Sequence, residues 1–233
     1  NSGTDALMMA LWSLGISKGD EVITSPISFI ATVGAIIHVG AVPVFVDISE
    51  DLNIDPNKIE EKITKKTKAI MPIHWAGKMC DMEKIVKIAK KYKLKIIEDA
   101  AQGMGSFFKK KHAGTFSHVA AFSTHPLKNL NGLGDGGFII TNNKKIYQKI
   151  KLYRNHGMKS RDNVHVFGVN SRLDVINAEV LNFRLKKLKS IINRRNKNIQ
   201  LYKKYIKSDK IQFPKDIFNS ISSSVIFICI CEN

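Results

Sequence analysis

Lys128 stands in a sequence context that could make a lysine side chain reactive. It follows a short apolar strand and Pro126, and it precedes a glycine-rich loop, in the segment FSTHPLKNLNGLGDGG. An amine that attacks a carbonyl group must be partly shielded from water, because only the neutral form is nucleophilic and burial favours that form. A lysine by itself means little among 31. This context, however, indicates a lysine that forms a Schiff base with a carbonyl compound.

Asp99 offers a second reactive group. It directly follows the apolar segment KIIE, and in α/β folds ligands bind at the carboxyl ends of the strands. A carboxylate there can pair with a cationic ring nitrogen and hold it protonated, which the ring of pyridoxal 5'-phosphate (PLP) requires. An aspartate that caps the next turn explains the same residue equally well. Gln102 lies one short turn later and could hydrogen-bond the same ring.

Two short segments could hold a phosphate group. Ser2, Gly3 and Thr4 immediately precede a predicted helix, where free backbone amides and the helix dipole attract anions. When these three residues are taken alone, a plain Ser or Thr N-cap is the simpler interpretation. Ser123, five residues before Lys128, provides another hydroxyl group.

A second glycine pattern in the same region has a different meaning. Gly132, Gly134 and Gly137 match G-x-G-x-x-G by spacing. The dinucleotide-binding fingerprint must follow a strand and open a helix, whereas FIIT, a predicted strand, follows these glycines. We therefore reject a dinucleotide site.

Other reactive residues favour structural roles. His74 lies at a strand end in PIHWAG, where a packed, hydrogen-bonded histidine is the favoured interpretation, and no Ser or Cys elbow supports a hydrolase triad. Cys80 stands alone, and Cys229 and Cys231 form a C-x-C without a second cluster. We expect incidental thiols and no metal site.

The composition is that of an ordinary globular protein. The chain has 233 residues, 44% hydrophobic and 24% charged, enough for one α/β domain and part of another. No apolar run approaches the ~18 residues of a membrane helix, and no secretory signal is recognisable, so we expect a cytoplasmic protein. The chain begins without Met and ends in an apolar stretch. We expect both ends to be truncated.

The net charge of +17 is weak information about partners, because 31 of the 37 basic residues are lysines. Bidentate phosphate recognition and base reading favour arginine. Between residues 180 and 208 there are ten basic residues and no acidic one. No aromatic residues interleave with these charges in a stacking pattern, so a solvated helix face is favoured over a nucleic-acid surface.

The elements that position these residues alternate between short strands and amphipathic helices. Predicted strands cover residues 21–24, 42–46, 68–73, 95–98, 119–123 and 138–141. Predicted helices cover residues 4–14, 29–39, 55–63 and 81–92, and a long helix or helix pair covers 174–206. This order predicts an α/β fold with a mostly parallel sheet and helices on both faces.

Six motifs in the chain resemble those of the DegT/DnrJ/StrS sugar aminotransferases, which are PLP enzymes of fold type I. The motifs occur in the family's order, over residues 1 to about 200: SGTDAL, PISFIATVGAI with GAVPVFVDI, IEDAAQ, FSTHPLKNLNGLGDGG, RNHG and GVNSRLD. The resemblance implies an aspartate-aminotransferase-like large domain over residues 1–175. It also implies that residues 176–233 form a long helix and the start of a smaller C-terminal domain.

The resemblance also implies roles for individual residues. Lys128 would form the Schiff base with PLP and move a proton. The remaining implied roles are pairing with the pyridine nitrogen (Asp99), contact with the ring's phenolic oxygen (Gln102), phosphate binding (Gly3, Thr4 and Ser123), stacking on the ring (Phe29) and a phosphate contact from the neighbouring subunit (Asn170). A homodimer with shared active sites follows from the last role.

The implied reaction is transfer of an amino group, with glutamate as donor and a nucleotide-linked keto-sugar as acceptor. Relatives that dehydrate the sugar instead carry His in place of this lysine, so Lys128 favours transamination over dehydration or epimerisation. A non-catalytic, basic binding protein on the same fold is the remaining alternative, motivated by the net charge of +17.

Overall fold

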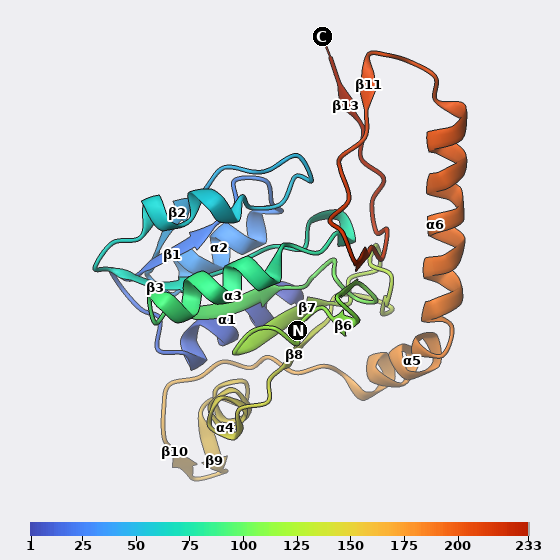
Figure 1. The fold of residues 1–233 in the computed structure, drawn as a ribbon. Helices are drawn as coiled ribbons and strands as arrows, with labels where there is room; N and C mark the ends of the chain where they lie inside the picture. Colours follow the sequence, from blue (N-terminus) through green and yellow to red (C-terminus); the bar gives the residue numbers. More distant parts are fainter. Residues whose placement is uncertain (233) are drawn as a thin grey trace.

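A twisted six-stranded sheet forms the centre of the protein, for which a computed structural model describes residues 1–232. The strand order is β2-β1-β3-β4-β7-β8, and only β8 runs antiparallel to its neighbour (Figure 1). The bounds are β1 Glu21–Thr24, β2 Val42–Phe45, β3 Thr67–Ile70, β4 Lys95–Asp99, β7 Val119–Ser123 and β8 Gly137–Ile140. The predicted mostly parallel sheet is confirmed.

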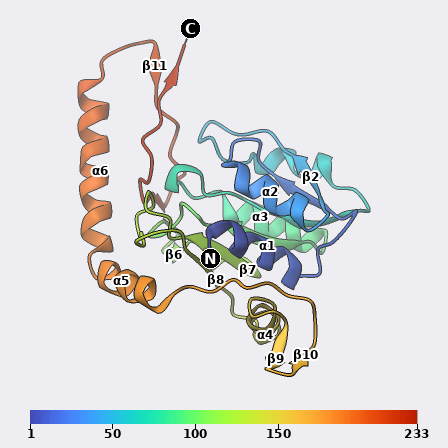
Figure 2. The same cartoon turned by 180° about the vertical axis from the view of Figure 1, so that it is seen from behind.

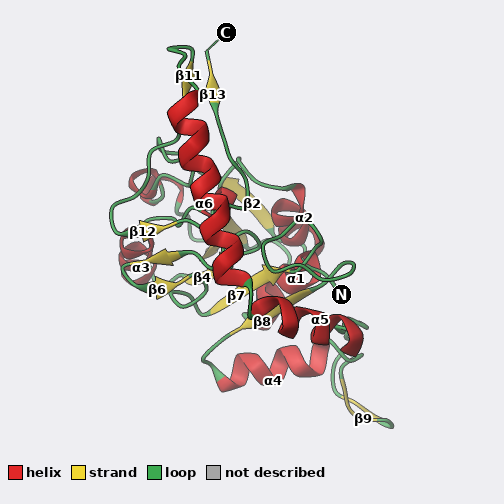
Figure 3. Ribbon diagram, turned by 90° about the vertical axis from the view of Figure 1, so that its right-hand side faces the viewer, coloured by secondary structure: helices red, strands yellow, loops and turns green. Residues whose placement is uncertain are grey.

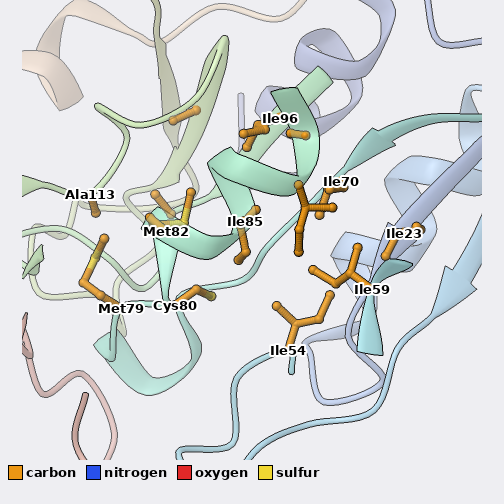
Figure 4. Close-up of a cluster of buried hydrophobic side chains, with 14 of the residues drawn as sticks. Ile23, Ile54, Ile59, Ile70, Met79, Cys80, Met82, Ile85, Ile96 and Ala113 are labelled. Atoms are coloured by element: carbon orange, nitrogen blue, oxygen red, sulfur yellow. The ribbon is translucent and has the colours of Figure 1, made fainter. Parts of the chain in front are cut away.

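Helices cover both faces of this sheet because successive strand residues point to opposite sides. Helices α1 (Gly3–Ser13), α2 (Ile30–His38) and α4 (Lys144–Tyr153) lie on one face, which Figure 2 shows from the front. Helix α3 (Met82–Lys91) lies on the other, where Ile85 packs with Ile23 and Ile70 of the sheet (Figure 4). Two apolar cores, one under each layer, therefore hold the strand ends in fixed positions.

The remainder of the chain consists of short elements and a helix pair. Helices α5 (Val175–Leu185) and α6 (Leu188–Tyr205) follow the sheet domain, and the long α6 runs along one side of it, in the foreground of Figure 3. The short strands are β5 Phe107–Phe108, β6 Lys111–His112, β9 Met158–Ser160, β10 Asn163–Val164, β11 Ile211–Gln212, β12 Ser220–Ile221 and β13 Ile230–Cys231. Strand β12 pairs with β5, so the C-terminal segment returns to the sheet domain.

Several predicted elements differ from the observed ones. Residues 55–63 form two 3-10 turns, η1 (Pro56–Lys58) and η2 (Glu60–Lys62), instead of an α-helix, although Asp55 does cap the first turn. A third turn, η3 (Trp75–Gly77), follows β3. The segment 174–206 is a helix pair. Of its apolar side chains, Leu181, Leu188 and Ile192 are buried, whereas Leu185 and Tyr202 are exposed.

Within residues 1–232, no helix is both long enough and apolar enough to span a bilayer.

Candidate active site

The predicted site residues come from four places in the sequence and meet where the parallel strands end. Asp99 is the last residue of β4, and Ser123 is the last residue of the neighbouring strand β7. Gly3 begins α1, and Lys128 lies in the loop that leaves β7. Because β4 and β7 are adjacent and parallel, their final side chains lie at one edge of the sheet.

Asp99 is a buried carboxylate with two hydrogen-bond donors. Thr32 of α2 donates its hydroxyl to Oδ2 at 2.6 Å, and the backbone N–H of Ala101 donates to Oδ1 at 3.1 Å. The turn-capping role is therefore present, and it does not exhaust the carboxylate's capacity. Burial raises the pKa of Asp99 above its ordinary value, while the Thr32 and Ala101 hydrogen bonds and the charges of Lys128 and His74 oppose the rise.

Lys128 lies half-buried in the field of this carboxylate. Burial lowers the pKa of Lys128 below the ordinary lysine value, and the negative charge of Asp99 opposes the change. A lowered pKa increases the fraction of neutral amine, the form that can attack a carbonyl carbon. The expectation that Lys128 differs from a solvated surface lysine agrees with this environment.

The loop that carries Lys128 is fixed at several points. Thr124 accepts a backbone hydrogen bond from Gly132 at 2.7 Å, which closes the loop at its base. Asn129 Nδ2 donates to the carbonyl oxygen of Ser223 at 2.6 Å, and Arg184 Nη1 donates to that of Asn131 at 2.7 Å. Residues far along the chain thus hold the lysine, and nothing in their local sequence indicated this function.

The beginning of α1 provides a seat for an anion. Ser2 caps the helix by accepting a hydrogen bond from Asp5 N at 3.1 Å, as the simpler interpretation proposed. Within residues 1–232 the backbone N–H groups of Gly3 and Thr4 have no hydrogen-bond acceptor. A Cβ atom on Gly3 would lie 2.7 Å from Cβ of Ser123, so the missing side chain brings the serine against the free amides. A phosphate fits these donors.

Gln102 and Phe29 border the same region in different environments. The Gln102 side chain is buried, and its Oε1 accepts a hydrogen bond from Ala76 N at 2.5 Å. Its amide nitrogen has no recorded partner in the described part of the chain, so it could still donate to a ligand. Phe29 precedes α2 with 67% of its surface exposed. An exposed aromatic face beside the site is free to stack on a ring.

Asn170 lies beside the start of α1 of the same chain. Its backbone oxygen accepts a hydrogen bond from Asn1 Nδ2 at 3.1 Å, and the next residue, Ser171, donates to Asp5 Oδ2 at 2.6 Å. The Asn170 side chain is exposed. A contact with a neighbouring subunit stays a prediction.

His74 and Glu98 form a fully buried pair behind the site. His74 Nε2 and Glu98 Oε2 lie 2.8 Å apart, and Cys80 N donates to His74 Nδ1. Burial raises the pKa of Glu98, but the hydrogen bond and charge of His74 and the N–H of Gly114 outweigh it, so the pKa is lowered. The packed, hydrogen-bonded His74 is confirmed. A glutamate inside the apolar segment KIIE was the available signal for its partner.

The rejected glycine pattern is explained by close packing. Gly137 opens β8, a strand, so the G-x-G-x-x-G spacing does not precede a helix. A Cβ on Gly137 would lie 2.5 Å from the carbonyl oxygen of Ser2, whereas one on Gly134 would meet no atom within 4 Å. The missing side chain at Gly137 therefore lets β8 pack directly against the start of α1.

PLP fits this set of residues. The free amides of Gly3 and Thr4 with the Ser123 hydroxyl suit the phosphate, the buried Asp99 carboxylate suits a protonated ring nitrogen, and the half-buried Lys128 amine suits the aldehyde. The buried side-chain oxygens Thr124 Oγ1 and Asn129 Oδ1 have no partner within the described residues, so the loop retains hydrogen-bonding capacity.

Known proteins of similar sequence and structure include a sugar transaminase and a protein solved with the cofactor PMP. The chain is 44% identical over 214 residues to dTDP-3-amino-3,6-dideoxy-alpha-D-galactopyranose transaminase of Aneurinibacillus thermoaerophilus, covering 91% of this chain and 59% of the relative. The crystal structure of S. venezuelae DesV with a ketimine intermediate superimposes with a TM-score of 0.96 at 37% identity, over 100% of this chain and 63% of DesV. NtdA of Bacillus subtilis, solved with bound cofactor PMP, gives 0.89 at 35% identity, over 99% and 54%.

The likeness extends over the whole chain but not over the whole of these relatives, since the chain spans roughly three fifths of their length. The match to the sequence profile of the DegT/DnrJ/EryC1/StrS aminotransferases covers residues 1–232. The structural matches confirm the fold of a PLP aminotransferase. The chain belongs to the DegT/DnrJ/EryC1/StrS aminotransferase family.

Proposed function

We propose that this protein is a PLP-dependent aminotransferase that transfers an amino group from glutamate to a nucleotide-linked keto-sugar. The observation that carries the proposal is that Lys128 and Asp99 lie close enough to influence each other's pKa. A lysine whose pKa is lowered by burial lies in the field of a buried carboxylate, at the sheet edge where this fold class binds its ligands.

Each residue has a defined task toward the cofactor. The amides of Gly3 and Thr4 and the Ser123 hydroxyl would bind the phosphate, and Phe29 would cover one face of the ring. Asp99 would keep the ring nitrogen protonated, and Gln102 would donate to the ring's phenolic oxygen. The chemistry that PLP supplies when bound is that of an electron sink.

Lys128 would both hold the cofactor and move protons. Its Nζ would hold the aldehyde group of PLP until the donor amine takes its place. Because burial lowers the pKa of this amine, a larger fraction of it is neutral, and the neutral form would move a proton from one carbon to another. Asp99 would support this step by holding the positive charge on the ring nitrogen.

The relatives support the proposed substrate class. The dTDP-sugar transaminase shares 44% identity with this chain, which supports a nucleotide-linked sugar and a role in amino-sugar or surface-polysaccharide biosynthesis. We further propose a cytoplasmic homodimer in which Asn170 reaches the partner's phosphate site. Residues 1–175 would form the PLP domain, and residues 176–233 the beginning of the smaller one.

The test is the visible absorption of the purified chain mixed with PLP. We expect a protein-bound band that persists after gel filtration, is absent in Lys128→Ala, and is bleached by glutamate. Lys144→Ala, which removes an exposed lysine, is the matched control and should keep the band. If a folded wild-type chain binds no PLP, the proposal is wrong. If the band forms but only amines other than glutamate bleach it, the donor is wrong.

A further inference from the structure

Thr32 is a buried hydroxyl residue in a helix whose other residues, apart from His38 at its end, are apolar or glycine. It lies in α2, is 1% exposed, and donates to Asp99 Oδ2 at 2.6 Å. The backbone N–H of Ala101 donates to the other oxygen, Oδ1. Within residues 1–232, Thr32 is the only side chain that donates a hydrogen bond to this carboxylate.

Ser28 extends this contact toward the outside. Its Oγ lies 2.5 Å from Thr32 Oγ1 and 2.9 Å from the carbonyl oxygen of Phe29. Ser28 is partly exposed and precedes the exposed Phe29. Two contacts therefore join a surface hydroxyl to the buried carboxylate, and both are short enough for a hydrogen bond. The Phe29 carbonyl oxygen is a further acceptor for Ser28.

The two hydroxyl groups can arrange their hydrogens in two ways, because each hydroxyl has one hydrogen and accepts through its oxygen. When Asp99 is ionised, Ser28 donates to Thr32 and Thr32 donates to the carboxylate. When Asp99 is protonated, the carboxyl donates to Thr32, Thr32 donates to Ser28, and Ser28 donates to the Phe29 carbonyl oxygen. In both patterns the carboxyl group and both hydroxyl hydrogens have a hydrogen-bond partner, and only the second pattern uses the contact from Ser28 to the Phe29 carbonyl oxygen.

We propose that Ser28 and Thr32 form a two-hydroxyl relay that lets Asp99 exchange a proton with the outside and stay hydrogen-bonded in both protonation states. Thr32 is a positioning residue in this proposal, since it acts through Asp99. The inference rests on the proposed function, in which Asp99 pairs with the protonated ring nitrogen of PLP.

The proton balance of the relay is complete. One proton arrives at Ser28 Oγ from water, the original Ser28 hydrogen passes to Thr32, and the original Thr32 hydrogen passes to Asp99 Oδ2. Only O–H bonds form and break, and the product of this transfer is the second hydrogen-bond pattern. The reverse transfer releases one proton from Asp99 to water.

A change of protonation is needed because the surroundings of Asp99 change. Without cofactor, burial favours the neutral carboxyl, and the charged or titratable groups facing it are Lys128 from the loop after β7 and His74 from the segment after β3. With PLP bound, a cationic ring nitrogen would face Asp99 and change this balance. The two hydroxyl groups give the carboxylate a proton route that does not depend on the ligand.

The first experiment titrates Asp99 in the chain without cofactor, by NMR of ¹³C-labelled aspartate carboxyl groups assigned with Asp99→Asn. Thr32→Val keeps the shape but removes the donor to the ionised form, so the acid dissociation constant of Asp99 should fall about tenfold. Ser28→Ala leaves the Thr32 hydroxyl hydrogen without an acceptor in the protonated form, whereas in the ionised form that hydrogen keeps the carboxylate as its acceptor, so the constant should rise. Thr24→Val, which removes another buried hydroxyl that donates to Met71 O, should change nothing.

Opposite shifts from two neighbouring hydroxyl groups distinguish a relay from general disturbance of the fold. Thr32→Ser should restore the wild-type value, which also covers the case in which Thr32→Val folds poorly. If both variants shift Asp99 in the same direction, or neither shifts it, the relay is wrong.

The second experiment measures affinity for PLP and for its deaza analogue, in which carbon replaces the ring nitrogen. Thr32→Val should weaken PLP binding about tenfold and leave the analogue unaffected. Equal loss for both ligands would overturn the relay's link to the ring nitrogen. If wild-type chain binds neither ligand, the proposed function fails, while the NMR titration still decides whether the relay exists.

Discussion

Gly137→Ala should disturb the proposed phosphate-binding site at the start of α1, because the new Cβ would displace backbone atoms there. A Cβ at this position would lie 2.5 Å from the carbonyl oxygen and 2.6 Å from the carbonyl carbon of Ser2, and 2.8 Å from the amide nitrogen of Gly3. Contacts between a Cβ and backbone atoms below 3.0 Å cannot be relieved by a side-chain rotation. The alanine therefore pushes β8 and the start of α1 apart.

The expected magnitude follows from the number of contacts. Overpacking of this kind typically costs ~1–3 kcal/mol, and here three backbone atoms are involved. We expect the free energy of unfolding to fall by about 2 kcal/mol or more. Displacement of Gly3 N also removes one donor to a charged group, so PLP should lose about tenfold in affinity relative to pyridoxal, which has no phosphate.

Urea unfolding and paired titrations with PLP and pyridoxal check this prediction. Gly134→Ala is the matched control, because a Cβ there meets nothing within 4 Å and its backbone is not in the left-handed region. That variant should be neutral or stabilising by up to ~1 kcal/mol. If Gly137→Ala keeps both the wild-type stability and the wild-type preference for PLP, the seat has been assigned to the wrong atoms.

Three further predictions concern single side chains. Phe29→Ala should weaken PLP binding about twofold to tenfold through lost stacking with little change in stability, whereas Ile30→Ala, at an equally exposed position, should leave binding unchanged in the same titration. Glu98→Gln should cost about 3–5 kcal/mol in urea unfolding, because it breaks a buried pair, and the exposed control Glu83→Gln should cost almost nothing. Since the folded-state pKa of Glu98 is lowered, its stabilisation should be present above the ordinary glutamate pKa and disappear as the pH falls below it. Competitive amine labelling should find Lys128 reactive at a lower pH than surface lysines, because burial lowers its pKa; equal reactivity would contradict that environment.

Local sequence was sufficient for the strands and most helices. Short β-branched runs and helical periodicity are local signals, and they placed β1 at Glu21–Thr24 and β7 at Val119–Ser123. The helix prediction for residues 55–63 was wrong because an aspartate cap followed by Pro56 begins a 3-10 turn as readily as an α-helix. Helix α4 was not predicted, although Asn143 caps it.

The order of motifs was also sufficient to predict the family, and hence Lys128, Asp99 and the residues of the phosphate seat. These residues follow strand ends or begin a helix, so the rule for parallel sheets alone brings them to one edge. Their roles toward PLP stay proposals, and their placement in the fold agrees with those roles.

Only the tertiary structure showed what holds these groups in place. The hydroxyl of Thr32 reaches Asp99 across 67 residues of sequence, and Asn129 reaches Ser223 across 94. Such contacts depend on how α2 packs on the sheet and how the C-terminal segment returns to it, and no local pattern encodes that packing. The sequence by itself determined which chemical groups are present and which strand ends carry them. The fold decided which groups are buried, which are paired, and therefore which pKa values are shifted, because burial and pairing are properties of neighbours in space.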